Sequence, residues 1–237
     1  MRQQRGAALL LMLWVVGLLS VLLGGLAVSV QLQQRQARWQ GNQAQAAFAA
    51  QAGFNLAVAN LLGDDSARWP ADGTEHSLRF AGSTLRVSVV SERGKLDLNA
   101  TPATGLERLL LASGASAERS KTITQALRTR RNKVPLRMLE EFRELPGMTY
   151  AIYDRALPFI TVWSGTAQPD PSLAAPALAK ALGLPRYPGA ALDAGQILTV
   201  TSAATLPSGF QSRLQATFVL LPAYAGGKPY RVLRWQD

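Results

Sequence analysis

Residues 1–30 read MRQQRGAALLLMLWVVGLLSVLLGGLAVSV, a short basic start followed by a run over residues 7–30 that contains no charged residue. A helix over this run is roughly 36 Å long at about 1.5 Å per residue, enough to cross a hydrocarbon core of about 30 Å. Arg2 and Arg5 directly precede the run and favour an N-terminus that stays in the cytoplasm. The sequence therefore predicts one membrane-spanning helix at residues 7–30, with the rest of the chain exported.

A cleaved signal peptide is the alternative interpretation of this segment. It shares the basic start and the apolar run, and Ala27-Val28-Ser29 is a passable small-residue cleavage site. However, the apolar core of a signal peptide usually covers about 7–15 residues, which is shorter than the run found here. The helical pattern also continues beyond it. Both features favour a retained membrane helix.

The segment that follows, residues 31–62, is rich in Gln and Ala and contains no proline. We therefore predict a single helix over residues 7–62, about 84 Å long at 1.5 Å per residue. The first half would lie in lipid, and the second would pack an apolar stripe against the rest of the protein. That predicted stripe consists of Ala44, Phe48, Ala52, Phe54, Val58, Leu61 and Leu62.

The remaining chain alternates between strand and helix patterns. Period-two alternation predicts strands at residues 77–80, 83–91, 96–99, 197–202, 213–220 and 230–235. A hairpin turn is expected at Gly82-Ser83. Helical spacing predicts three short helices between residues 102 and 153, the third running from Pro135 to Pro146. A further short helix is expected near residues 178–182. An antiparallel sheet packed on the exported half of the long helix, an α+β fold, accounts for this order.

Composition argues against catalysis. The chain has no cysteine and one histidine, His76, so a thiolate metal site is excluded and no cofactor is expected. No Gly-x-Ser-x-Gly elbow is present. Glu140 and Glu141 are neighbours on a predicted helix and point about 100° apart, which prevents them from converging as a catalytic pair. We therefore predict a protein that is not an enzyme.

Several segments together resemble one family, the type II secretion minor pseudopilin called general secretion pathway protein K. The resemblance covers most of the chain. Its leader ends in Gly6 followed by Ala7 and a long apolar helix, and Leu11 occupies the fifth mature position, where most pilin-like subunits have Glu and the K subunit does not. The other matching segments are residues 45–62, GKLDLNA at 94–100, residues 136–161 ending in LPFIT, and YRVLRW at 230–235.

This resemblance implies a pilin-like fold and a role in protein secretion. Prepilin peptidase is expected to cleave after Gly6 and to methylate Ala7. The protein would span the bacterial inner membrane once, with its C-terminal domain in the periplasm, and would enter the periplasmic pseudopilus. The implied partners are other minor pseudopilins, the major pseudopilin, prepilin peptidase and the inner-membrane assembly platform, and no nucleic acid is expected.

The resemblance also implies a position in the fibre. In a pilin-like fibre, the Glu at position five of an incoming subunit pairs with the N-terminal amine of the subunit above it. A carboxylate in lipid is costly unless it is paired. Leu11 leaves no carboxylate to satisfy, so we expect this subunit to sit at the tip, where it would initiate and cap the fibre.

The implied organisation is a leader at residues 1–6, the long helix at 7–62 and the first part of the sheet domain at 63–101. These are followed by a helix-hairpin-helix-like insertion at 102–160, a Pro/Ala-rich connection at 161–196 and C-terminal strands at 197–237. Typical members carry a larger helical domain, so we expect the shortened insertion to contact its partners differently. Calcium occurs in this group, but it needs six to eight oxygen ligands. The candidate aspartates are too scattered to assign: Asp64, Asp65, Asp72, Asp97, Asp170 and Asp193.

The alternative function is a membrane-anchored DNA-binding protein of the DNA-uptake type. The net charge of +10 and the basic run at residues 128–133 would suit phosphate groups. Tandem helix-hairpin-helix domains use a Gly-x-Gly turn to bring backbone N–H groups close to phosphate. Ser113-Gly114-Ala115 and Gly147-Met148-Thr149 each lack the second glycine. A packing module with a solvated basic face is therefore the favoured interpretation.

Overall fold

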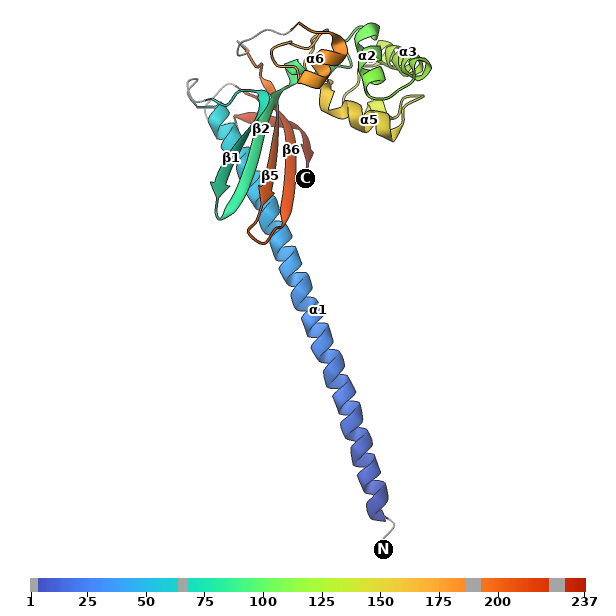
Figure 1. Ribbon diagram of the computed structural model, residues 1–237, viewed down its shortest axis with the longest axis vertical. Coiled ribbons are helices and arrows are strands. Elements are labelled where there is room, and N and C mark those ends of the chain that lie inside the picture. Colours follow the sequence, from blue (N-terminus) through green and yellow to red (C-terminus); the bar gives the residue numbers. More distant parts are fainter. Residues whose placement is uncertain (1–3, 64–67, 186–192, 222–228) are drawn as a thin grey trace.

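A computed structural model describes residues 4–63, 68–185, 193–221 and 229–237. Helix α1 (Gln4–Leu61) is one continuous element of 58 residues, about 87 Å long at 1.5 Å per residue. Its N-terminal half projects from the body of the molecule as a single rod, and its C-terminal end packs on a sheet (Figure 1). This element corresponds to the helix predicted over residues 7–62.

The sheet has five antiparallel strands in the order β1-β2-β5-β6-β7. They are β1 (Asp72–Phe80), β2 (Ser83–Ser91), β5 (Ile197–Thr205), β6 (Gln211–Leu220) and β7 (Tyr230–Gln236). Each strand pairs with its sequence neighbour within this sheet, and a helical unit is inserted between β2 and β5. The α+β fold predicted from the sequence, a long N-terminal helix on an antiparallel sheet, is confirmed.

The core between α1 and the sheet depends on a close approach of the helix. Phe54 makes edge-to-face contacts with Phe218, Tyr230 and Trp235, with ring centroids 5.5–5.6 Å apart. At the preceding residue, a Cβ at Gly53 would collide with the side chain of Ser202 on β5. Glycine costs up to about 1 kcal/mol relative to alanine in a helix, and here its lack of a side chain lets the helix lie against the strand.

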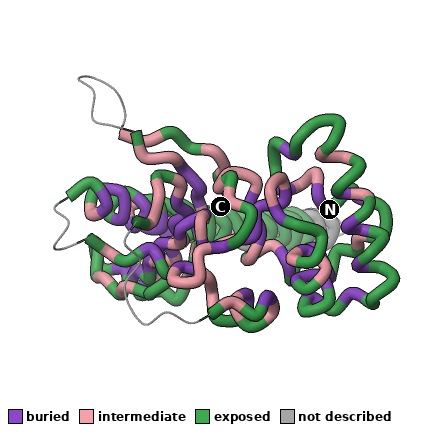
Figure 2. Tube along the Cα trace, turned by 90° about the horizontal axis from the view of Figure 1, so that it is seen from above, coloured by how far each residue is buried: buried purple, intermediate pink, exposed green. Residues whose placement is uncertain are grey.

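The inserted unit has a hydrophobic core of its own. It contains α2 (Ala103–Ala112), α3 (Ala117–Lys133), α4 (Glu140–Arg143), α5 (Tyr150–Ala156) and α6 (Pro176–Leu182). The short turns η2 (Glu92–Gly94) and η3 (Leu157–Phe159) flank a parallel pair of two-residue strands, β3 (Leu96–Asp97) and β4 (Ile160–Thr161). Viewed from above, buried segments occur both in the body formed by α1 and the sheet and in the inserted helical unit (Figure 2).

The Pro/Ala-rich connection contributes to this unit. Leu178 and Leu182 of α6 are buried in the helical core, and Arg108 of α2 donates to the carbonyl of Leu182 at 2.8 Å. The short helix expected near residues 178–182 is therefore present. It closes the helical unit instead of lying free between two domains.

Two local predictions were wrong. The first hairpin turn has Ala81 and Gly82 as its central residues, both with positive φ, and Phe80 pairs with Ser83. This is the backbone that a two-residue type I′ turn requires, one position earlier than expected. The third predicted helix, from Pro135 to Pro146, is only the four-residue α4.

The shortening of that helix has a visible cause. Asn99 accepts from the N–H of Leu136 at 2.8 Å and donates to its carbonyl at 2.9 Å, so it captures both backbone groups of that residue. Glu141 then accepts from the N–H groups of Arg137 and Met138. In a helix that starts at Pro135, the carbonyl of Leu136 would accept from the N–H of Glu140, and Asn99 takes that carbonyl instead, while Leu136 stays buried in the core.

Candidate membrane and assembly surfaces

The N-terminal half of α1 exposes a continuous apolar surface. Trp14 is 74% exposed and Val21 is 76% exposed, and Ser20 is the hydroxyl-bearing residue between them. The most apolar 18-residue window of the helix has a mean hydropathy of 2.3, and none of its described residues is buried. The Ser20 hydroxyl donates to the carbonyl of Val16 at 2.8 Å, so its polar group is satisfied within the helix. By length and composition, this segment can cross a membrane.

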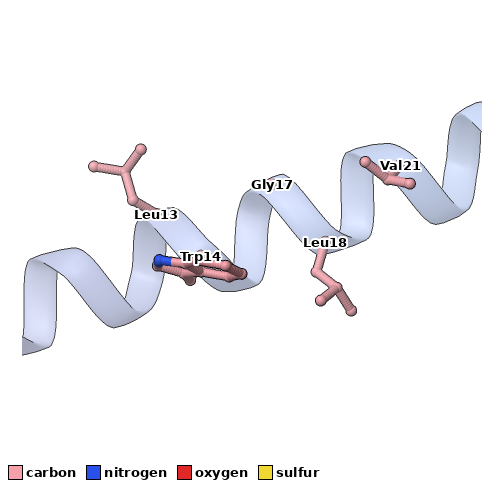
Figure 3. A pocket seen from close by; sticks show the side chains of 5 residues that line it. All are labelled: Leu13, Trp14, Gly17, Leu18 and Val21. Atoms are coloured by element: carbon pink, nitrogen blue, oxygen red, sulfur yellow. The ribbon is translucent and has the colours of Figure 1, made fainter.

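A shallow hollow interrupts this surface at Gly17. Leu13 and Trp14 lie one turn before it, and Leu18 and Val21 lie on its other side (Figure 3). A Cβ at Gly17 would meet nothing within 4 Å among the described residues. The hollow is lined by apolar groups and offers no polar chemistry, so its shape suits a lipid chain or an apolar neighbour.

The three residues singled out for processing and fibre position, Gly6, Ala7 and Leu11, lie within the backbone of α1. Their side chains are outside the described part of the structure. Cleavage after Gly6 and the role of Leu11 therefore stay predictions.

The C-terminal part of α1 has one face that packs on the sheet and a second face that is exposed. The predicted apolar stripe contains residues from both faces. Ala50, Phe54, Val58 and Leu61 are buried against the sheet, which confirms the prediction for Phe54, Val58 and Leu61. The remaining predicted residues do not pack there, since Ala44, Phe48 and Leu62 are exposed and Ala52 is half-buried.

The second face of α1 has no partner among the described residues. Phe48 is 70% exposed, and Leu56 and Leu62 are also exposed. No charged residue occurs between Arg38 and Asp64. Amide side chains such as Gln51 and Asn55 are also exposed here, so the face is uncharged and carries large apolar side chains, which are typical of surfaces that contact a partner. This face is therefore a candidate assembly surface that continues the apolar segment towards the sheet.

The polar residues of the segment GKLDLNA at residues 94–100 have structural contacts. Lys95 pairs with the buried Glu92, whose Oε1 also accepts from the hydroxyl of Thr199 on β5 at 2.6 Å. Asp97 is buried and accepts from the N–H groups of Asn99 and Gly165. These contacts tie the sheet to the start of the helical unit, which gives the motif a packing role.

The first hairpin of the helical unit offers little to a phosphate group. The N–H of Gly114 donates to Leu111 and the N–H of Ala115 donates to Leu110, so both turn amides are already hydrogen-bonded. The guanidinium of Arg155 also lies over Gly114, where a Cβ would collide with it. In the second hairpin, the N–H of Met148 donates to Leu145.

The basic run at residues 128–133 is partly used within the protein. Arg130 pairs with Glu141 at 2.6 Å, and Arg131 donates to the carbonyl of Thr101 at 2.7 Å. Arg128 is exposed. Two of the three arginines therefore stabilise the unit, as expected for a packing module.

The two adjacent glutamates turn to different partners, as their spacing predicts. Burial is the largest influence on Glu140 and would raise its pKa, but hydrogen bonds, chiefly with Arg234, and the charges of Arg234 and Arg143 together outweigh it, so the pKa lies below its ordinary value. The backbone N–H of Arg137 is the largest influence on Glu141 and, with Met138 and Arg130, also holds the pKa of Glu141 low. Both carboxylates are ionised structural groups at neutral pH.

Three of the aspartates considered as calcium ligands accept hydrogen bonds from their own turns. Asp72, Asp170 and Asp193 each accept from a backbone N–H two residues further along the chain. Asp64 and Asp65 lie outside the described residues. Among the described residues, no three His, Asp or Glu side chains are grouped as a metal site would require.

His76 contributes to packing. Its ring stacks on Trp69 with the ring centroids 4.4 Å apart and an interplanar angle of 10°.

Among solved structures, the chain is similar to one from the GspK-GspI-GspJ complex of the enterotoxigenic Escherichia coli type 2 secretion system. The TM-score is 0.60 with 14% sequence identity, and the match covers 85% of this chain and 98% of that chain. No protein-family model and no curated protein matches the sequence. At this identity the likeness establishes the fold, which is pseudopilin-like.

Proposed function

We propose that this protein is a minor pseudopilin of a type II secretion system, equivalent to the K subunit. The observation that carries the proposal is the architecture, in which an exposed apolar helix leads into a pseudopilin-like sheet with a helical unit inserted between β2 and β5. The sequence resemblance points to the same subunit, since K subunits have a helical domain between strands.

In the proposed mechanism, the apolar half of α1 holds the subunit in the inner membrane until assembly. Extraction from lipid would expose a large apolar surface to water, so the helix must exchange lipid for neighbouring subunits. The second face of α1, with Phe48, Leu56 and Leu62, continues that surface above the membrane and supports the same role. Other minor pseudopilins and the major pseudopilin are the proposed neighbours.

The proposed position is the tip of the fibre. With Leu11 at the fifth mature position, the subunit has no carboxylate that needs the N-terminal amine of a subunit above it. A subunit of this kind can begin and cap a fibre, which would then drive folded proteins across the outer membrane. This role makes the protein an assembly component and not an enzyme.

The N-terminal residue of the mature protein tests the proposal directly. Mass spectrometry of protein purified from its native membrane should show methylated Ala7, the product of prepilin peptidase. Val30 at the N-terminus would indicate signal peptidase, and Met1 would indicate an uncleaved anchor. Either of those results would contradict the pseudopilin assignment.

A further inference from the structure

The sheet face that points away from α1 carries arginines on three strands. Arg86 of β2 lies opposite Ala203 of β5, and Ala203 lies opposite Arg213 of β6. The two arginines therefore flank a small residue in one cross-strand row. Neighbouring strands are about 4.7–4.9 Å apart, so the two arginine Cα atoms are separated by roughly 9.5 Å. Arg79 of β1 faces the same side, one row further towards the β1–β2 turn.

The small Ala203 leaves a hollow between the longer side chains. The rest of its lining contains one carboxylate, from Glu75, and hydroxyl and amide groups from Ser88, Thr201, Thr205, Gln211 and Ser212. The hollow ends where the helical unit begins. In the row beyond Thr201, Thr199 is covered by Glu92 and Lys95.

The guanidinium groups around this hollow have N–H donors that are free to bind a ligand. Arg86 has one nearby carboxylate, Glu75, at 3.9 Å, which is beyond hydrogen-bonding distance, and both side chains are 56% exposed. Among the described residues, no side chain pairs with Arg213 or with Arg79. Three arginines facing one glutamate leave the surface positively charged.

The lining chemistry selects a class of ligand. Guanidinium groups bind carboxylates through paired hydrogen bonds, while hydroxyl and amide side chains both donate and accept, as a peptide backbone does. Rows repeat at about 6.8 Å along a strand, the spacing of alternate residues in an extended chain, and this is the step from the row of Arg86 and Arg213 to the row of Arg79. No aromatic ring lines the hollow among the described residues, so it lacks the stacking platform of single-stranded nucleic-acid sites.

We propose that this hollow binds an extended acidic segment of a partner polypeptide, with its carboxylates on Arg86 and Arg213 and with Arg79 as a third charge. The binding site lies on the opposite side of the sheet from α1, and its residues have no part in the apolar surfaces of that helix. The inference therefore does not depend on the proposed function.

Calorimetric titration of the full-length protein in an uncharged detergent, at 150 mM NaCl, tests this proposal. The probe is an octapeptide of alternating Glu and Thr, and its counterpart carries Gln in place of Glu. We expect the Glu peptide to bind at least tenfold more tightly than the Gln peptide. The double variant Arg86→Gln/Arg213→Gln should lose at least tenfold in affinity.

Two further variants separate this site from general charge. Arg119→Gln/Arg128→Gln removes the same charge from exposed positions on α3 and should change affinity less than twofold. Ala203→Phe keeps the charge but fills the hollow, and aromatic residues are tolerated on strands. This variant should bind at least tenfold more weakly at unchanged circular dichroism.

The proposal is overturned by any of four results. The first two are no binding of the Glu peptide to the wild-type protein and an equal loss of affinity in both double arginine variants. The other two are unchanged affinity of Ala203→Phe for the Glu peptide, and tighter binding of an oligothymidylate that has the same charge as that peptide. The last result would identify the surface as a nucleic-acid site.

Discussion

Arg234 of β7 donates to Oε1 of Glu140 through both Nη2, at 2.7 Å, and Nε, at 3.1 Å, so the last strand of the sheet holds the helical unit inserted 94 residues earlier. The side chain of Arg234 is 14% exposed and that of Glu140 is 42% exposed. Together with the buried Glu92–Lys95 pair, this contact sets how the helical unit lies on the sheet. A polar contact of this kind can be broken without removing either hydrophobic core.

The first prediction concerns this pair. The pKa of Glu140 is lowered in the folded protein, so its contribution to stability is complete above its ordinary value of 4.5 and is lost as pH falls through the lower, folded pKa. Because Glu140 is partly exposed, solvent screening limits the effect to about 0.2–1 kcal/mol. Glu140→Gln should remove this part of the pH dependence and increase hydrogen exchange where the helical unit meets the sheet.

Glu144→Gln is the matched control, because Glu144 is exposed on the same segment. It should leave both measurements unchanged at pH 7. The same pH profile for Glu140→Gln and for the wild-type protein would show that the pair has no part in stability.

The second prediction compares two glycines in α1. Gly41 has open space around a Cβ, so Gly41→Ala should stabilise the helix by up to about 1 kcal/mol. Gly53→Ala gains the same helix propensity but forces a Cβ against Ser202, and overpacking costs about 1–3 kcal/mol. Thermal unfolding should therefore show a higher Tm for Gly41→Ala and a lower Tm for Gly53→Ala. Equal increases in both variants would mean that the helix does not approach β5 as closely as described.

The third prediction is that processing requires Gly6. A side chain at the last leader position should not fit a peptidase that accepts glycine there, so Gly6→Val should leave the full-length protein in the inner membrane and abolish secretion. Immunoblotting and a secretion assay measure the two effects. Normal secretion with an unprocessed variant would contradict the pseudopilin assignment.

The fourth prediction is that Leu11→Glu impairs initiation. On membrane-insertion scales, a charged residue such as Asp, Lys or Arg at the centre of a helix costs about 2.5–3.5 kcal/mol of insertion free energy. The cost is smaller near the end of the helix. At the tip this carboxylate would stay unpaired, so fewer or aberrant fibres should form at unchanged expression. Fibre number and length, counted at matched protein levels, are the measurements. Equal or more numerous fibres would place the subunit along the shaft.

The fifth prediction is that the protein binds duplex DNA weakly. The affinity should fall steeply with salt concentration, because only charge–charge contacts to phosphate would contribute. Arg130 and Arg131 have structural partners, so the test variant is Lys121→Ala/Arg128→Ala, both exposed on α3. Fluorescence anisotropy at physiological salt should show little binding by the wild-type protein. Tight binding that is lost in this variant would favour the DNA-uptake alternative.

The sequence by itself determined the features that depend on local pattern. The charge-free run predicts an apolar helix because length and hydropathy are properties of consecutive residues, and alternation along β2 predicts a strand that buries Leu85, Val87 and Val89. The α+β order follows from the succession of these patterns. The expected roles of Gly6 and Leu11 are likewise predictions from the sequence, because they depend on position relative to the predicted leader.

Only the tertiary structure decided contacts between residues that are far apart in the chain. Periodicity could not separate the two faces of α1, since both carry large apolar side chains and only the sheet selects the one with Phe54. The four-residue length of α4 depends on Asn99, whose side chain binds a backbone 37 residues away. The row formed by Arg86, Ala203 and Arg213 exists only because strand pairing places three separate segments in register, a choice made by the sheet as a whole.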